Sequence, residues 1–383
     1  MPIVFVHGVN NRKGSDYEDN EVGRNAFIKA IVAPALGLDG KSVVVRSPYW
    51  GGNGVAFAWD MAVLPEAKQG FESFAGDAFK AVAEAQTAQI AANLNLDDTL
   101  VESARKDFPR TVEALYASML AGVTSEDAAA KIAASYAKAE KYAADDPHPA
   151  WLDDPALTDA DFAAELNDQL NKLPGESFGA GGLFDQLKEG ASRLINALPK
   201  AGSDALIKLG RKKLNTAAGL FSGDAFVYLQ SRGDRAAPGP IIKIVLDDLR
   251  AAAAAKTATD NKLLVIAHSF GGEIMYDILT HFAPELEVDV LVTAGSQVGL
   301  FEEMKLFKES TASPPPGKVP MPKNVGRWMN VFDTNDILSY TAEPVFEGVE
   351  DYHYDTGFAA TQAHGGYFVQ PSFYARLAER LKA

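Results

Sequence analysis

Cysteine is absent from the 383-residue sequence. Disulfide bonds, a thiolate nucleophile and cysteine-ligated zinc are therefore excluded. An unbroken apolar run of about 18 residues is also missing, so we expect no transmembrane helix. The sequence has no H-E-x-x-H pattern, no other clustered metal ligands and no phosphate-cradling loop. We therefore expect a protein that works without a metal or another cofactor.

The sequence has fewer basic than acidic residues: it contains 36 lysines and arginines and 51 aspartates and glutamates, which gives a formal net charge of −15. Phosphate backbones bind to cationic faces, so nucleic acid is not an expected partner. Electrostatic docking on anionic membranes is disfavoured for the same reason, although less strongly. A β-rich pattern begins at residue 2 and leaves no room for a signal peptide. A cytoplasmic location is the default expectation, with signal-independent export left open.

Residues 263–266 form a short apolar run of the kind that a strand buried on both faces needs. The run leads into A-H-S-F-G-G, with Ser269 at its centre, and apolar residues four apart follow over residues 274–282. Strand, tight turn and helix, with a serine at the apex, is the geometry of a nucleophile elbow. Small residues two before and two after the serine let backbones pass closely, and Ala267 and Gly271 stand there. A serine that merely caps a helix N-terminus is the alternative interpretation.

This segment resembles the elbow of the α/β-hydrolase fold, in the small-residue variant A-H-S-x-G-G found in some bacterial lipases. The resemblance covers residues 1–51 and 236–383. It implies an α/β fold with a mostly parallel sheet flanked by helices, and a serine hydrolase of the esterase or lipase kind. Ser269 would be the nucleophile, with His268 and Gly271 as supporting residues.

The start of the chain carries a second part of the resemblance. Residues 2–6 are β-rich and end in a His7-Gly8 pair, and in hydrolases of this type such a pair opens the loop that forms half of the oxyanion hole. The backbone N–H groups of Val9 and Phe270 would then bind the developing oxyanion. Gly8 would permit the close approach that the loop needs. We expect His7 to be a structural histidine that bonds its own loop, and not the base.

A serine nucleophile needs a base within hydrogen-bond reach, and histidine is the usual one. Three of the six histidines follow Ser269 in the sequence. His281 lies in or just after the elbow helix, too close along the chain to reach back over the serine. His353 stands among acidic residues and is expected at the surface. His364 is expected in a loop just before the terminal helix, where the α/β-hydrolase fold has its base, and is our candidate.

The acid of such a triad comes between the serine and the histidine in the chain. Two aspartates follow the expected strand at residues 327–332. Asp336 precedes the apolar Ile337-Leu338, which resembles the setting of the family's acid, and we favour it. Asp333 ends the strand itself and stays open as the alternative acid. The carboxylate would hold the imidazole in the right tautomer.

The stretch from residue 52 to residue 235 is rich in alanine, with helical patterns and almost no β-run. We expect it to form a large all-helical cap inserted into a core made of residues 1–51 and 236–383. Two apolar stripes, within residues 183–198 and 206–221, favour helices that pack on each other. A mobile lid whose apolar face contacts lipid transiently is the alternative.

The predicted substrate is a small-molecule or lipid ester, hydrolysed through an acyl-enzyme. The same triad also serves thioesterases, acyltransferases and phospholipases, so these activities stay open as alternatives. A non-catalytic binding protein that retains the fold is a rival from another class. The sequence indicates no oligomeric state.

Overall fold

The computed structural model describes residues 2–13, 15–62, 99–120, 126–173, 182–197, 205–258, 261–311, 317–358 and 363–382. Its centre is a six-stranded sheet in the order β10-β8-β6-β5-β1-β2, in which every neighbouring pair is parallel. The predicted α/β architecture with a mostly parallel sheet flanked by helices is thereby confirmed. The strands are β1 (Ile3–Val6), β2 (Val45–Arg46), β5 (Leu264–His268), β6 (Val288–Ala294), β8 (Val325–Phe332) and β10 (Val349–His353).

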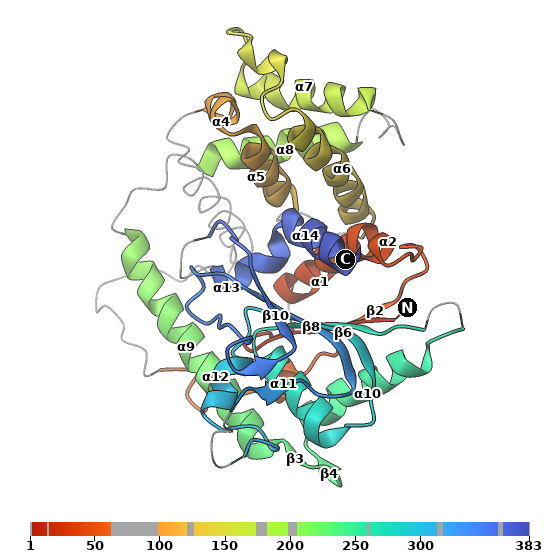
Figure 1. Cartoon of the computed structure of the whole chain (residues 1–383). Coiled ribbons are helices and arrows are strands. Elements are labelled where there is room, and N and C mark those ends of the chain that lie inside the picture. The colour runs from red at the N-terminus through yellow and green to blue at the C-terminus, as the bar shows by residue number, and fades with distance from the viewer. Residues whose placement is uncertain are drawn as a thin grey trace.

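The central strands supply two hydrophobic cores, one on each face of the sheet. In β1, Ile3 and Phe5 belong to the first core, whereas Val4 and Val6 belong to the second, because successive side chains of a strand point to opposite faces. Helices α1 (Ser15–Phe27) and α14 (Pro371–Lys382) cover the first face (Figure 1). Helices α10 (Pro240–Ala254), α11 (Gly271–Asp277) and α12 (Val298–Glu303) cover the second (Figure 1).

Strand β1 lies between β2 and β5, and the chain reverses its direction of travel across the sheet at this point. The register pairs Val6, the last residue of β1, with Ala267 near the end of β5. In open α/β sheets, ligand sites form beyond the carboxyl ends of the strands at such a reversal. The loop after β1 and the turn after β5 therefore meet where a site is expected.

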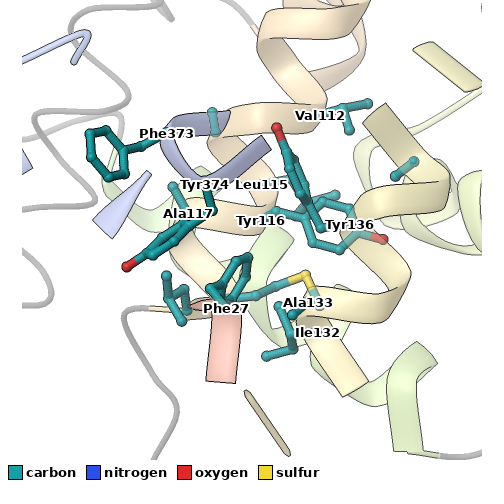
Figure 2. Close-up of a cluster of buried hydrophobic side chains, with 14 of the residues drawn as sticks. Phe27, Val112, Leu115, Tyr116, Ala117, Ile132, Ala133, Tyr136, Phe373 and Tyr374 are labelled. Carbon is teal, nitrogen blue, oxygen red and sulfur yellow. The ribbon is translucent and has the colours of Figure 1, made fainter. Parts of the chain in front are cut away.

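Five helices from the middle of the chain pack over α1 and α14 and extend the first core away from the sheet (Figure 1). Figure 2 shows Phe27 of α1 beside Tyr116 and Tyr136, with Tyr374 of α14 in the same cluster. In the predicted stripe at residues 183–198, the described side chains of Leu187, Ala191 and Leu194 are buried, and their helix packs against its neighbours. The five helices are α4 (Leu100–Lys106), α5 (Phe108–Leu120), α6 (Glu126–Asp145), α7 (Asp159–Lys172) and α8 (Gly182–Ala197).

The long helix α9 (Ala205–Ser231) reaches the second core with its C-terminal part. Tyr228 packs edge-on against Phe270, and its hydroxyl donates a hydrogen bond to Asp277 of α11 over 2.8 Å. Phe221 contacts the same phenylalanine ring. The end of the predicted cap segment is therefore packed directly on the helix that follows Ser269.

None of the helices in the described part of the chain is long and apolar enough to cross a lipid bilayer.

The remaining elements are short. The helical turns are η1 (Ile28–Val32), α2 (Ala33–Ala35), η2 (Gly51–Asn53), η3 (Ala150–Asp153), η5 (Ile278–Phe282), α13 (Ala363–Gly366) and η6 (Tyr367–Val369). The short strands are β3 (Gly233–Asp234), β4 (Ala237–Pro238), β7 (Val319–Pro320) and β9 (Phe346–Glu347).

Candidate active site

Ser269 stands at the turn between β5 and α11 with a backbone φ of +51°. A positive φ is uncommon for a residue with a side chain, and it costs free energy that the surrounding structure must offset. The Ser269 N–H donates a hydrogen bond to the carbonyl of Ala294 over 2.9 Å, which holds the turn against β6. The serine is thus fixed in a strained elbow, the local geometry that the sequence pattern predicts.

The small residues of the elbow have identifiable neighbours. A Cβ on Gly271 would collide with the carbonyl oxygen of Val6, so glycine lets α11 start directly over β1. A Cβ on Gly272 would collide in the same way with Ser296. Ala267 is fully buried within the sheet. The pattern therefore reflects close backbone packing, and a serine that only caps a helix would not require it.

His364 lies between the serine and an aspartate. Its Nε2 is 2.8 Å from Ser269 Oγ, and its Nδ1 is 2.9 Å and 3.1 Å from the two carboxylate oxygens of Asp336. With the carboxylate facing Nδ1, that nitrogen carries the proton of the neutral ring, so Nε2 accepts from the serine hydroxyl. The prediction that His364 lies in a loop is wrong, because it belongs to the short helix α13.

The chain matches no protein-family model, no curated protein and no solved structure. What the site can do is therefore argued from its own geometry. Three residues that are 28 to 95 positions apart in the sequence meet within hydrogen-bond distance. Such an arrangement of hydroxyl, imidazole and carboxylate is the constellation of nucleophilic catalysis by serine.

Asp336 is buried and held from three sides. Its carboxylate accepts hydrogen bonds from the Leu338 N–H over 2.9 Å and from the Tyr367 hydroxyl over 3.0 Å, besides that of His364. Gly295 has a φ of +59°, and a Cβ there would lie 3.1 Å from the Asp336 carboxylate and 2.8 Å from the Tyr367 ring. These contacts fix the carboxylate before any substrate arrives, which suits an orienting role.

Asp333, the alternative acid, faces elsewhere. Its carboxylate accepts hydrogen bonds from the Thr356 N–H over 2.9 Å, the Thr356 hydroxyl over 2.6 Å and the Asn335 N–H over 2.8 Å. These bonds join the end of β8 to the segment after β10. The structure therefore brings Asp336 to His364 and uses Asp333 to connect two strand ends.

His268, a predicted supporting residue, contacts the same helical turn. Its Nε2 donates a hydrogen bond to the carbonyl of His364 over 2.8 Å, and the two rings lie 5.0 Å apart. Burial, together with repulsion from His364, lowers the pKa of His268 to about 3. The ring therefore stays neutral and holds the backbone of α13 without competing for the proton of Ser269.

The loop after β1 lies directly against the nucleophile. A Cβ on Gly8 would be 2.6 Å from the Cβ of Ser269, so only glycine fits there. Within the described residues no hydrogen-bond acceptor is assigned to the N–H of Val9 or of Phe270, the two predicted oxyanion donors. Phe270 follows Ser269 in the chain, and Val9 follows the glycine that contacts Ser269.

His7 holds its own loop, as expected. Its Nδ1 donates to the carbonyl of Gly8 over 2.8 Å, and its Nε2 accepts from the Trp50 N–H over 3.1 Å. The Trp50 ring stacks on the imidazole at 4.8 Å. Burial lowers the pKa of His7 to about 4, so both bonds are those of a neutral ring.

No sequence pattern indicated Asp224, which fixes the other side of this loop. It lies on α9 with no exposed surface and forms an ion pair with Arg12 at 2.6 Å. Its carboxylate also accepts the Asn10 N–H over 2.9 Å and the Val55 N–H over 2.7 Å. The loop that carries Val9 is thus bound between the elbow and the last turns of α9.

Proposed function

We propose that this protein is a serine hydrolase of the α/β-hydrolase fold that cleaves carboxylic esters through an acyl-enzyme. The observation that carries the proposal is His364, which lies within hydrogen-bond distance of both Ser269 Oγ and the Asp336 carboxylate. The strained backbone of Ser269 at the carboxyl end of the central strand β5 adds support. The order serine, aspartate, histidine along the chain is that of the same family.

The reaction starts when Ser269 Oγ attacks the ester carbonyl carbon and its proton passes to His364 Nε2. Asp336 stabilises the imidazolium that forms, and the N–H groups of Val9 and Phe270 bind the oxyanion. Collapse of the tetrahedral intermediate expels the alcohol, which takes the proton from Nε2 and leaves the acyl group on Ser269. A water molecule then attacks the acyl carbon while its proton passes to His364 Nε2, and that proton returns to Ser269 Oγ as the bond from Oγ to the acyl carbon breaks and the carboxylic acid leaves.

In this proposal, residues 52–235 form the cap of the hydrolase core and help to enclose a small-molecule or lipid ester. Ile337 is 59% exposed and Tyr340 is 38% exposed, and both follow Asp336 closely in the chain, so they are our candidates to contact an apolar acyl group. Exposed apolar side chains that gather near a site are typical of surfaces that bind apolar ligands.

The decisive experiment is hydrolysis of p-nitrophenyl esters with short to long acyl chains. Wild type should turn over, Ser269→Ala should show only background, and Asp336→Asn should lose roughly 10³- to 10⁴-fold in kcat. Asp333→Asn is the matched control: it should keep kcat within about tenfold while losing about 1–3 kcal/mol of stability from its broken hydrogen bonds. Activity that survives Ser269→Ala would contradict the proposal. Wild type that is silent on every ester and takes no fluorophosphonate label would contradict it equally.

A further inference from the structure

A cavity of about 400 Å³ opens at the junction of the middle helices with the C-terminal part of the chain. Its walls come from α5, α6, the segment after β10 and the start of α14. Neither Ser269 nor His364 nor Asp336 lines it. The cavity has the size of a small-molecule site, and the proposed hydrolase reaction does not use it.

Acidic side chains outnumber basic ones in the cavity lining, and burial raises the pKa of two of them, Glu113 and Glu140. Four carboxylates line the cavity, from Asp107, Glu113, Glu140 and Asp355, against the two guanidinium groups of Arg110 and Arg376. Both arginines are exposed, whereas Glu113 and Glu140 are partly shielded from solvent. The charge of Arg376 nevertheless acts on both Glu113 and Glu140, and its guanidinium lies over the Tyr354 ring.

The hydrogen-bond donors of the inner wall are already engaged. Glu113 accepts from the Tyr136 hydroxyl over 2.5 Å and from the Ser372 N–H over 3.2 Å, and the Tyr354 hydroxyl is 2.7 Å from Ser372 Oγ. The Gln370 amide donates to the carbonyl of Thr356 over 2.9 Å. The wall thus has no spare donor for an anionic or carbonyl-bearing ligand among these groups.

Two hydrogen-bond acceptors of the cavity lining, in contrast, have no assigned donor: the Glu140 carboxylate and Gln370 Oε1. No hydrogen-bond donor or salt-bridge partner is assigned to Glu140 within the described residues, and burial together with repulsion from Glu113 raises its pKa to about 7. Gln370 is 7% exposed, and its Oε1 has no hydrogen-bond partner. The charge of Arg376 partly opposes this shift in the pKa of Glu140. A half-buried carboxylate without a hydrogen-bond donor is costly, and a cation that donates hydrogen bonds would offset that cost.

We propose that this cavity binds a small organic cation through a primary ammonium group held by Glu140 and Glu113. An ammonium supplies a positive charge together with the hydrogen-bond donors that the Glu140 carboxylate and Gln370 Oε1 lack. The rings of Tyr136 and Tyr354 line the same space. Because the Arg376 guanidinium already lies 5.7 Å from the centroid of the Tyr354 ring, Tyr136 is the ring that suits an organic cation. A metal ion fits less well, since the described residues contain no group of three or more histidine, aspartate or glutamate side chains arranged to hold one.

The test is isothermal titration of the Ser269→Ala protein with 1,5-diaminopentane, so that binding does not depend on ester hydrolysis. The neutral 1,5-pentanediol and the dianion glutarate have similar length and serve as ligand controls. Glu140→Gln should weaken diamine binding at least tenfold, because it removes a charge-assisted hydrogen bond. Glu303→Gln, which changes an exposed carboxylate on α12, should leave binding unchanged.

Diamine binding that is lost in Glu140→Gln and absent for the diol would support the proposal. Four results would each overturn it: no diamine binding, diol binding of equal strength, tighter binding of glutarate, or equal diamine affinity in the Glu140→Gln and Glu303→Gln proteins. Thermal unfolding of both variants establishes that they are folded. Glu140→Gln should be at least as stable as wild type, since it removes a carboxylate that burial disfavours.

Discussion

Tyr367 joins the two aspartates that follow β8. Its hydroxyl donates to the Asp336 carboxylate over 3.0 Å and accepts the N–H of Asp333 over 3.0 Å. One side chain therefore sets the position of the carboxylate that faces His364 and of the strand end that carries Asp333. Because the hydroxyl touches neither Ser269 nor the expected oxyanion site, Tyr367 is a positioning residue in the proposed reaction.

Tyr367→Phe should lower kcat for p-nitrophenyl esters about tenfold, with KM nearly unchanged, since it removes one hydrogen bond to a charged group. The ring stays in place, so the fold should be retained. The measurement is steady-state kinetics beside Tyr142→Phe, which removes a hydroxyl on α6 that accepts a hydrogen bond from the Trp151 side chain and contacts no triad residue. Equal kcat in the two variants would show that the hydroxyl of Tyr367 does not orient the acid.

At the scale of elements, the loop after β1 depends on a helix more than two hundred residues away in sequence. Asp224 on α9 binds Asn10 and Arg12 of this loop and also Val55. A Cβ on Gly54 would be 2.7 Å from the guanidinium of Arg12, so glycine makes room for the ion pair. The position of the Val9 N–H is therefore coupled to the packing of α9.

Asp224→Asn should lower kcat about 10- to 100-fold with little change in KM, because the amide nitrogen faces donors and the loop loses its fixed position. Hydrogen exchange should become faster in residues 8–12 and stay unchanged at the elbow. Asp248→Asn is the control, since Asp248 pairs with Arg46 at a partly exposed site. Unchanged exchange at residues 8–12 would contradict the coupling, whatever the esterase activity.

At the scale of the whole molecule, the middle helices and the sheet share one hydrophobic core. Phe27 is fully buried, and its ring contacts Tyr136 of α6 and Tyr374 of α14 (Figure 2). The same cluster continues to Leu264 and Ile266 of β5. Helices that share a core with the sheet are expected to unfold with it.

Phe27→Ala should reduce the free energy of unfolding by about 3–5 kcal/mol, as expected for a large ring removed from a packed core. Circular dichroism follows all helices, and tryptophan fluorescence in a Trp59→Phe/Trp151→Phe background follows Trp50 and Trp328 near the sheet. The two signals should give coincident transitions. Phe226→Ala is the control, because that ring is 69% exposed and its loss should change stability by less than about 0.5 kcal/mol. Separate transitions would show that the middle helices unfold independently.

The pH dependence of stability also belongs to this scale. Burial raises the pKa of Glu273 on α11 from 4.5 to about 8. Between these values the folded protein keeps the proton that the unfolded chain releases, so this group lowers the free energy of unfolding as pH rises.

Glu273→Gln cannot ionise, and its stability relative to wild type should increase from pH 5 to pH 8 by an amount on the order of 1–3 kcal/mol. Urea unfolding at several pH values measures this difference. Glu303→Gln, at an exposed site, should show a difference that does not change with pH. If the free energies of unfolding of the Glu273→Gln and wild-type proteins changed equally with pH, Glu273 would not be the group with the raised pKa.

The sequence by itself determined the features whose causes are local. Apolar runs predicted the buried strands β1 and β5, and small residues on both sides of Ser269 predicted the tight turn, because a turn and its neighbours are close in the chain. The preference for Asp336 over Asp333 and the choice of His364 came from the resemblance to the α/β-hydrolase family. The geometry around His364 agrees with both choices.

Only the tertiary structure decided which groups meet across long separations. Asp333 and Asp336 follow the same strand, and their different partners, Thr356 and His364, come from segments further along the chain. The ion pair of Arg12 with Asp224 spans 212 residues, and the cavity at Glu140 has walls from four elements. No local pattern encodes such contacts, because they depend on how the strands are ordered in the sheet and how helices pack over it.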